Sequence, residues 1–176
     1  AQINFDNCRI PAENLIGAEG QGYGIALGGL EGGRIGIAAQ SVGMARAAFE
    51  AALAYSKDRV AFGKPIFEHQ ALQFRLADMA MQIEASRLLV WRAAAALDAG
   101  EDAGLLGSYA KGFAADAAMS VTTDAVQVLG GAGIMREYPV GRIHRDGLVY
   151  VIGEGTSDIQ RNIIARDLGF KTCQSH

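Results

Sequence analysis

Residues 106–128, LGSYAKGFAADAAMSVTTDAVQV, decide the fold class of this chain. Apolar side chains recur here at steps of three and four, the spacing that gathers them on one face of a helix. The positions that keep this period are Leu106, Tyr109, Phe113, Ala117, Val121, Ala125 and Val128. A turn at Gly100-Glu101-Asp102 precedes the stretch, so we predict one long helix that ends at Gly130-Gly131.

Two earlier stretches show the same period. Their apolar positions are Ile35, Ala38, Val42, Ala45, Phe49 and Leu53 in the first, and Leu72, Leu76, Met79, Ile83, Val90 and Leu97 in the second. We predict a helix that runs to about Arg59 and another over residues 68–97, separated at Phe62-Gly63-Lys64-Pro65 because proline cannot continue a helix. Three helices of nearly 30 residues, each about 45 Å long, describe an antiparallel up-and-down bundle.

The predicted helix over residues 68–97 is apolar on more than one side. Leu88, Leu89 and Trp91 lie away from its main apolar stripe. Such a helix must be covered on more than one side. We therefore expect it either at the centre of the bundle or at a subunit interface.

Two shorter helices complete the all-α prediction. Tyr138-Pro139 opens the first, which runs to about Tyr150 and is broken by Gly153-Glu154-Gly155. Ser157 and Gln160 have the Ser-x-x-Gln spacing of a capping box, so the last helix is predicted to start there and to run to Leu168.

Composition and charge exclude several classes of function. The 176 residues are 50% hydrophobic, enough for one core, and the net charge of −3 gives no positive field for a nucleic-acid backbone. Charged residues interrupt each apolar stretch before it could span a membrane. The two cysteines, Cys8 and Cys173, and the three histidines lack the spacing of a disulfide framework or a metal site, and a reducing compartment fits best. Three arginines, Arg136, Arg142 and Arg145, are expected to form surface or interhelical ion pairs.

Glu154 is an acidic side chain between two glycines, in a break between helices. Its commonest interpretation is a solvated loop carboxylate near the positive end of a helix dipole. The alternative is a functional carboxylate, since flanking glycines let a ligand approach the backbone closely.

The run Gly153-Glu154-Gly155-Thr156-Ser157-Asp158-Ile159-Gln160-Arg161 closely resembles a signature of the acyl-CoA dehydrogenases. Further blocks resemble the same family in the same order: residues 32–38, 59–66, 76–80 and 127–131, then Tyr138-Pro139-Val140 with Arg145-Asp146. The resemblance covers essentially the whole chain.

The resemblance implies an FAD-dependent flavoprotein of fatty acid β-oxidation, an oxidoreductase of lipid metabolism that desaturates acyl-CoA thioesters. Family members pass electrons to an electron-transfer flavoprotein and assemble as homotetramers or homodimers. They have a helical, a β and a C-terminal helical domain, so residues 1–20 would be the tail of an upstream β-domain, and residues 21–176 the C-terminal bundle. Ile3 and Phe5, which alternate with polar residues, fit the last strand of such a domain, and the chain is expected to be a fragment that is not active alone. The location would be cytoplasmic in a bacterium and the mitochondrial matrix in a eukaryote.

The resemblance also implies roles for individual residues. Glu154 would be the base that removes the α-proton; some members carry this base on the first helix instead, where this chain has Gly33. Arg59 and Phe62 match FAD contacts from a neighbouring subunit, and the other matches to FAD contacts are Gln70, Gln127, Gly130, Gly131, Thr156 and Asp158. The positions that match substrate contacts are Glu31, Arg34 and Gly155. Without the resemblance, Arg59 would be a cation at a helix C-terminus, Phe62 a core aromatic and Gly130-Gly131 a helix stop. Thr156 and Asp158 would be capping residues, and Glu31 and Arg34 a surface ion pair.

Gly153 departs from the aromatic residue that precedes the base in many members, so the pocket beside the thioester is expected to have a different shape. The block over residues 32–35 looks most like short-chain and branched short-chain members. Two alternatives stay open: a non-catalytic helical oligomerisation module, and a related acyl-CoA oxidase.

Overall fold

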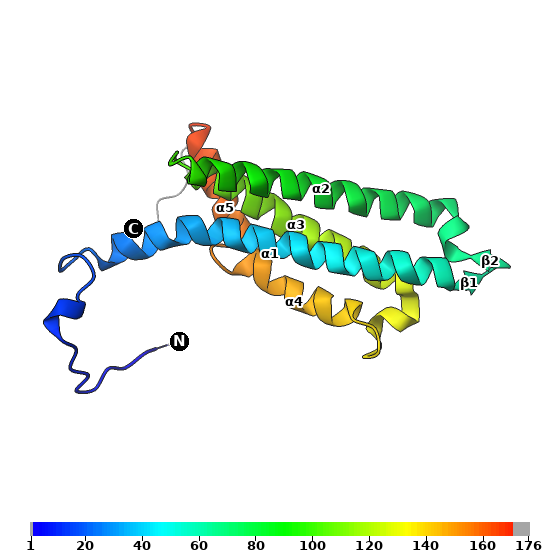
Figure 1. The fold of residues 1–176 in the computed structure, drawn as a ribbon, viewed down its shortest axis with the longest axis horizontal. Helices are drawn as coiled ribbons and strands as arrows, with labels where there is room; N and C mark the ends of the chain where they lie inside the picture. Colours follow the sequence, from blue (N-terminus) through cyan, green and yellow to red (C-terminus); the bar gives the residue numbers. More distant parts are fainter. Residues whose placement is uncertain (1, 171–176) are drawn as a thin grey trace.

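The computed structural model describes residues 2–170, and residues 22–167 form a bundle of long antiparallel helices. Figure 1 shows α1 and α3 running in one direction and α2 and α4 in the other, with α5 across one end. The helices are α1 (Gly22–Asp58), α2 (Gln70–Asp98), α3 (Gly104–Leu129), α4 (Val140–Ile152) and α5 (Ser157–Asp167), with short 3-10 turns at Ala12–Asn14, Ile66–Glu68 and Gly130–Ile134. The predicted all-α bundle is confirmed.

Glycine and proline set the ends of the long helices. Gly100 and Gly130, which follow α2 and α3, have positive φ angles of 73° and 58°, a backbone conformation that costs glycine little. Pro139 is the N-cap of α4. The helix boundaries expected from these residues therefore agree with the structure to within about two residues, apart from the start of α1, which the sequence pattern did not locate.

A small hairpin replaces the simple break expected after α1. It consists of β1 (Val60–Ala61) and β2 (Lys64–Pro65), paired antiparallel. Phe62 and Gly63 form the turn between them with φ angles of 54° and 81°. Two central residues with positive φ are typical of the tightest hairpin turns. The hairpin therefore projects the Phe62 side chain from the end of the bundle.

Helix α3, rather than α2, occupies the centre of the bundle. It packs against α1, α2, α4 and α5. Its buried residues are mostly small, which lets the neighbouring helices approach: Gly107, Ser108, Ala110, Lys111, Ala114, Ala115, Ala117, Ala118, Val121, Thr122, Ala125, Val128 and Leu129.

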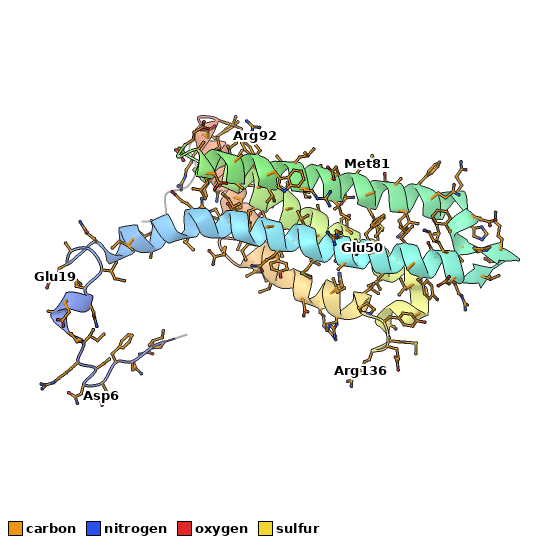
Figure 2. The ribbon with its side chains drawn as sticks, viewed as in Figure 1. Asp6, Glu19, Glu50, Met81, Arg92 and Arg136 are labelled. Carbon is orange, nitrogen blue, oxygen red and sulfur yellow. The ribbon has the colours of Figure 1, made fainter. Side chains whose placement is uncertain are left out.

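Helix α2 packs on α1 and α3 and leaves one apolar side uncovered. Phe74, Met81, Leu88 and Trp91 are all more than half exposed, and Figure 2 shows Met81 on the outer side of the helix. The expected central position of α2 is therefore wrong within this chain, while a subunit interface on this side stays a prediction.

The predicted capping box at the start of α5 does not form. Thr156 is the N-cap instead, and its Oγ1 accepts a hydrogen bond from the Ile159 amide at 3.2 Å. Ser157 is already the first helical residue, so its hydroxyl is free to donate to Asp116 on α3 at 2.8 Å. Gln160 is fully buried and its Nε2 donates to the Gly155 carbonyl, while its Oε1 accepts no hydrogen bond from the cap amide.

Residues 2–21 lie outside the bundle and are exposed. Among residues 2–170, strands occur only in the hairpin, so the strand expected near Ile3 and Phe5 stays a prediction. No helix in this part of the chain is long and apolar enough to cross a membrane, and no group of three or more His, Cys, Asp or Glu is placed to hold a metal. Cys8 is a free, exposed thiol, while Cys173 and His176 lie outside the described residues.

Candidate functional site

The predicted site residues fall into two groups at opposite ends of the bundle. The α4–α5 end holds Glu31, Arg34, Glu154, Gly155, Thr156 and Asp158, and the hairpin end holds Arg59, Phe62, Gln70, Gln127, Gly130 and Gly131. At 1.5 Å per residue, the length of α1 between Gly33 and Arg59 is about 39 Å. One small ligand therefore cannot touch both groups of a single chain.

Glu154 lies in the turn between α4 and α5 and reaches back to α1. Its φ angle is 54°, which is unfavourable for a residue with a side chain. A Cβ atom built on Gly33 would lie 2.7 Å from the Glu154 Oε2. The absence of a side chain at position 33 thus provides the space that the half-buried carboxylate occupies.

Two buried side chains hold the backbone of this turn. The Gly155 carbonyl accepts a hydrogen bond from Lys111 Nζ at 2.6 Å and another from Gln160 Nε2 at 3.0 Å. Gly155 has a φ of 85°, and a Cβ there would lie 2.7 Å from the Gln160 Nε2. Only glycine fits this position without a rearrangement.

Lys111 is the functional candidate that the sequence did not reveal. It lies on α3 and is completely buried. Burial lowers the pKa of Lys111, and the carboxylates of Asp116 and Glu154 oppose that shift. A signal was present: Lys111 shares a helical face with the buried residues Ser108 and Ala115, where a lysine is out of place.

Asp116 connects α3 to the start of α5. Its carboxylate accepts hydrogen bonds from the Ser157 hydroxyl and from the Arg161 guanidinium. Arg161 also donates a hydrogen bond to the Asp158 carboxylate, so Asp158 already has a partner within the chain. Thr156 is likewise engaged as the helix cap. The two predicted cofactor residues at this end therefore have structural roles as well.

Glu31 and Arg34 lie where α1 crosses the start of α3. A Cβ on Gly104 would be 3.9 Å from Glu31 Oε1, and one on Gly107 would be 3.8 Å from Arg34 Cβ. Among residues 2–170 the two side chains form no ion pair, and Arg34 Nε is buried without a hydrogen-bond partner. A buried donor without an acceptor is costly unless a ligand or water satisfies it.

At the hairpin end the candidate residues face outward. Phe62 is 97% exposed and meets the His69 ring edge-on at 6.1 Å. Arg59, Gly130 and Gly131 line a shared hollow of about 560 Å³ with Tyr55 and Tyr138. A Cβ on either glycine would meet nothing within 4 Å, so the backbone there is open to a ligand. Gln70 and Gln127 are exposed nearby but do not line this hollow.

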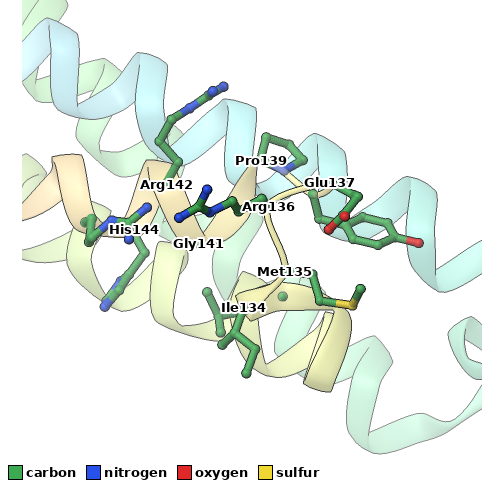
Figure 3. Close-up of a pocket in the computed structure, with 12 residues that line it drawn as sticks. Ile134, Met135, Arg136, Glu137, Pro139, Gly141, Arg142 and His144 are labelled. Carbon is green, nitrogen blue, oxygen red and sulfur yellow. The ribbon is translucent and has the colours of Figure 1, made fainter.

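The three arginines expected to form ion pairs form none among the described residues. Arg136, Arg142 and Arg145 instead line a cavity of about 750 Å³ together with His144 (Figure 3). His144 Nδ1 lies 3.1 Å from the Thr122 hydroxyl, which ties α4 to α3. None of the predicted site residues lines this cavity, and it lies in the half of the bundle away from Glu154.

A family model described as "Acyl-CoA dehydrogenase, C-terminal domain" matches residues 20–169 of the chain. A probable acyl-CoA dehydrogenase of Mycobacterium tuberculosis is 50% identical over 168 residues, which cover 95% of this chain and 43% of that protein. The chain thus spans less than half the length of the curated relatives that it matches.

Two solved structures share the fold at 48% sequence identity. Butyryl-CoA dehydrogenase from Megasphaera elsdenii superposes with a TM-score of 0.89 over 92% of this chain and 42% of that one. A chain in a structure described as the electron transferring flavoprotein of Acidaminococcus fermentans superposes with a TM-score of 0.91, over 93% of this chain and 43% of that one.

Proposed function

This chain belongs to the acyl-CoA dehydrogenase family, and we propose that it forms the C-terminal helical part of an enzyme that desaturates acyl-CoA thioesters between the α and β carbons. One observation carries the proposal. The Glu154 carboxylate lies against the open backbone of Gly33, in a turn whose carbonyl is held by a buried lysine. A surface carboxylate without a function has no need of such support.

Glu154 would act as the base. The α-proton of a thioester is only weakly acidic, so the reaction needs a carboxylate placed within hydrogen-bond reach of the α-carbon and shielded from water. FAD, when bound, would accept the hydride from the β-carbon. The half-buried Glu154 carboxylate lies against the backbone of Gly33 on α1, and the α-carbon of a thioester would approach it from the side that α1 leaves uncovered.

Three neighbours of Glu154 are proposed to bind the substrate. Gly155 continues the same turn, and Glu31 and Arg34 lie on α1 close to Gly33. Arg34 supports this assignment because its side chain is only half-buried and its positive charge suits a phosphate on the CoA portion of the substrate. The substrate class proposed is a short-chain or branched short-chain acyl-CoA.

The hairpin end fits part of an FAD site. Arg59 carries a positive charge beside the open backbone of Gly130 and Gly131, a combination suited to a pyrophosphate. Phe62 presents an exposed ring. The other proposed contacts are Gln70 and Gln127 at this end, and Thr156 and Asp158 at the α4–α5 end.

The separation of the two ends supports a homodimer or homotetramer. About 39 Å of α1 lies between Gly33 and Arg59, so the flavin beside Glu154 would receive the hairpin of a neighbouring copy. The exposed apolar side of α2 would be covered in such an assembly. Residues 2–20 would belong to an upstream β-domain that covers Ile3, Phe5 and Ile10, all mostly exposed here. The electron acceptor is proposed to be an electron-transfer flavoprotein.

The test uses the full-length, FAD-loaded protein that contains this chain. Butyryl-CoA and branched short-chain thioesters are added without oxygen, and flavin absorbance is followed in the parent and in Glu154→Gln. We expect bleaching in the parent and a bleaching rate at least about 1,000-fold lower in the variant, since a general base contributes up to about four orders of magnitude.

Three outcomes separate the alternatives. If Glu154→Gln holds FAD and bleaches as fast as the parent, Glu154 is not the base. If the full-length protein binds no flavin, the non-catalytic oligomerisation module is the better assignment. If the reduced flavin is reoxidised rapidly on admission of air, the protein is an oxidase rather than a dehydrogenase.

A further inference from the structure

Lys111 is the most unusual charged group in the bundle. It is completely buried on α3, and among the described residues its ammonium forms no ion pair within 4 Å. The partner of Nζ is the Gly155 carbonyl at 2.6 Å. A buried charge is costly unless the surrounding groups compensate it, so a lysine here needs a reason.

We propose that Lys111 is a positioning residue for Glu154: its ammonium holds the Gly155 carbonyl and thereby fixes the turn that directs the Glu154 carboxylate to α1. This inference rests on the proposed function, because it assumes that Glu154 is the base. Lys111 lies on α3, 43 positions before Glu154 in the chain, and would be a second residue on which proton removal depends.

The backbone of the turn explains why it must be held. Glu154 and Gly155 both have positive φ angles, 54° and 85°. A non-glycine residue in that region is strained, and the strained conformation persists only where the surroundings fix it. Two donors that converge on one carbonyl, Lys111 Nζ and Gln160 Nε2, provide that constraint.

Charge distinguishes the two donors. Lys111 brings a positive charge close to Glu154, whereas Gln160 is neutral. The acidic groups that act on Lys111 are Asp116 on its own helix and Glu154 on the turn. Arg161 on α5 already pairs with Asp116, which leaves Glu154 as the carboxylate without another ion pair among residues 2–170. Lys111 therefore attracts the Glu154 carboxylate through its charge in addition to holding the turn.

The experiment isolates proton removal from hydride transfer. The full-length, FAD-loaded protein is incubated in deuterated water with 3,3-dimethylbutyryl-CoA, which has α hydrogens but no β hydrogens. A proton can pass from the α-carbon to Glu154 and be replaced by deuterium, while no hydride can leave and the flavin stays oxidised. Mass spectrometry measures the exchange rate as a function of pH and of thioester concentration.

Three variants form a matched set. Lys111→Met removes the ammonium, Gln160→Met removes the neutral donor to the same carbonyl, and Lys57→Met makes the same substitution at an exposed lysine. We expect Lys111→Met to slow exchange roughly 10- to 100-fold, as a base displaced by about 1 Å would. The half-saturating thioester concentration changes little, because the Lys111 side chain binds the turn and not the substrate.

The other variants define the control results. Gln160→Met, which removes the other donor to the Gly155 carbonyl, also slows exchange, and Lys57→Met behaves as the parent. A Lys111→Met protein that holds flavin and keeps the parent's exchange rate overturns the proposal. If this variant does not fold, Lys111→Gln is measured instead. Its amide is uncharged and one atom shorter than the lysine, so an exchange rate equal to the parent's in that protein shows that the ammonium is not needed and overturns the proposal equally.

Glu154→Gln, measured in parallel, separates this inference from the proposed function. Exchange as fast as in the parent would show that Glu154 is not the base, and both proposals would fail. Loss of exchange in Glu154→Gln with normal exchange in the Lys111 variants would leave the base assignment intact and reject the role of Lys111 alone.

Discussion

The two ends of the bundle differ in how completely this chain builds them. At the α4–α5 end, Glu154 packs against Gly33 and its turn is anchored by Lys111 and Gln160 from α3 and α5. At the hairpin end, Phe62 is 97% exposed and Arg59 has no ion pair among residues 2–170. The α4–α5 end therefore fixes its side chains by contacts within the chain, whereas the hairpin end presents side chains to something outside the chain.

Among substitutions that leave Glu154 itself in place, the largest effect is expected from a methyl group beside it. In Gly33→Ala, the new Cβ would lie 2.7 Å from the Glu154 Oε2, so the flexible carboxylate must swing away. We expect thioester desaturation in the full-length enzyme to fall by about 100-fold. The melting temperature should hold or rise, because alanine stabilises a helix interior by roughly 0.5–1 kcal/mol over glycine.

Gly43→Ala is the matched control for this prediction. Gly43 also lies within α1, and a Cβ there meets nothing within 4 Å. The control should gain stability and keep its activity. Full activity in Gly33→Ala would mean that the carboxylate works from another position, and the contrast between the two ends would lose its basis.

The next largest effect concerns the packing of Gly133, in the turn after α3, against the backbone of Val126. A Cβ on Gly133 would lie 2.6 Å from the Val126 carbonyl oxygen and 3.1 Å from its Cα, and backbone atoms cannot rotate away. We expect Gly133→Ala to lower the free energy of unfolding by about 2 kcal/mol, as overpacking does. Gly131→Ala should leave it nearly unchanged, because that position is open.

Urea unfolding of the full-length protein and its two glycine variants measures this difference. Equal unfolding free energies of the two variants would show that the backbone after α3 shifts at little cost to make room for the added methyl group. The backbone at the hairpin end would then be flexible, and it would not hold the exposed ligand contacts in fixed positions.

A smaller effect should follow from removing the exposed cation at the hairpin end. Arg59→Gln is expected to weaken FAD binding about tenfold, since a hydrogen bond to a charged group contributes about 1.5–3 kcal/mol. The unfolding free energy of the flavin-free protein should not change, because Arg59 is exposed and forms no ion pair within residues 2–170. Equilibrium dialysis measures the first quantity and urea unfolding the second. A loss of stability with unchanged flavin affinity would make Arg59 a structural residue.

The sequence predicted the helices well because their ends depend on local chemistry. The glycine pair after Leu129 ends a helix and Pro139 begins one through local backbone geometry, so both helix ends can be predicted without knowledge of the fold. The capping box was wrong for a related reason: Thr156 and Ser157 are adjacent and both suit a cap, and the contact of Ser157 with Asp116 depends on how α5 packs against α3.

Tertiary packing hid the rest. The central position of α3 depends on small residues such as Ala114 and Ala118, which carry little hydrophobic signal but permit close approach of helices. Lys111 falls on that same face. A periodicity argument counts a lysine as polar and assigns it to solvent, whereas the carbonyl that accepts its hydrogen bond lies 44 residues further along the chain.

The smallest expected effect concerns the pH dependence of stability at the anchored end. Burial lowers the pKa of Lys111 in the folded protein, whereas an unfolded lysine has a pKa of about 10.4. Between these two values the unfolded chain binds more protons, so stability rises with pH across this alkaline window. Lys111→Met lacks this contribution. Urea unfolding at several pH values below about 10.4 should therefore show the parent gaining stability relative to the variant. Parallel pH curves would mean that Lys111 keeps its ordinary pKa when buried, and that the turn beneath Glu154 is hydrated in solution.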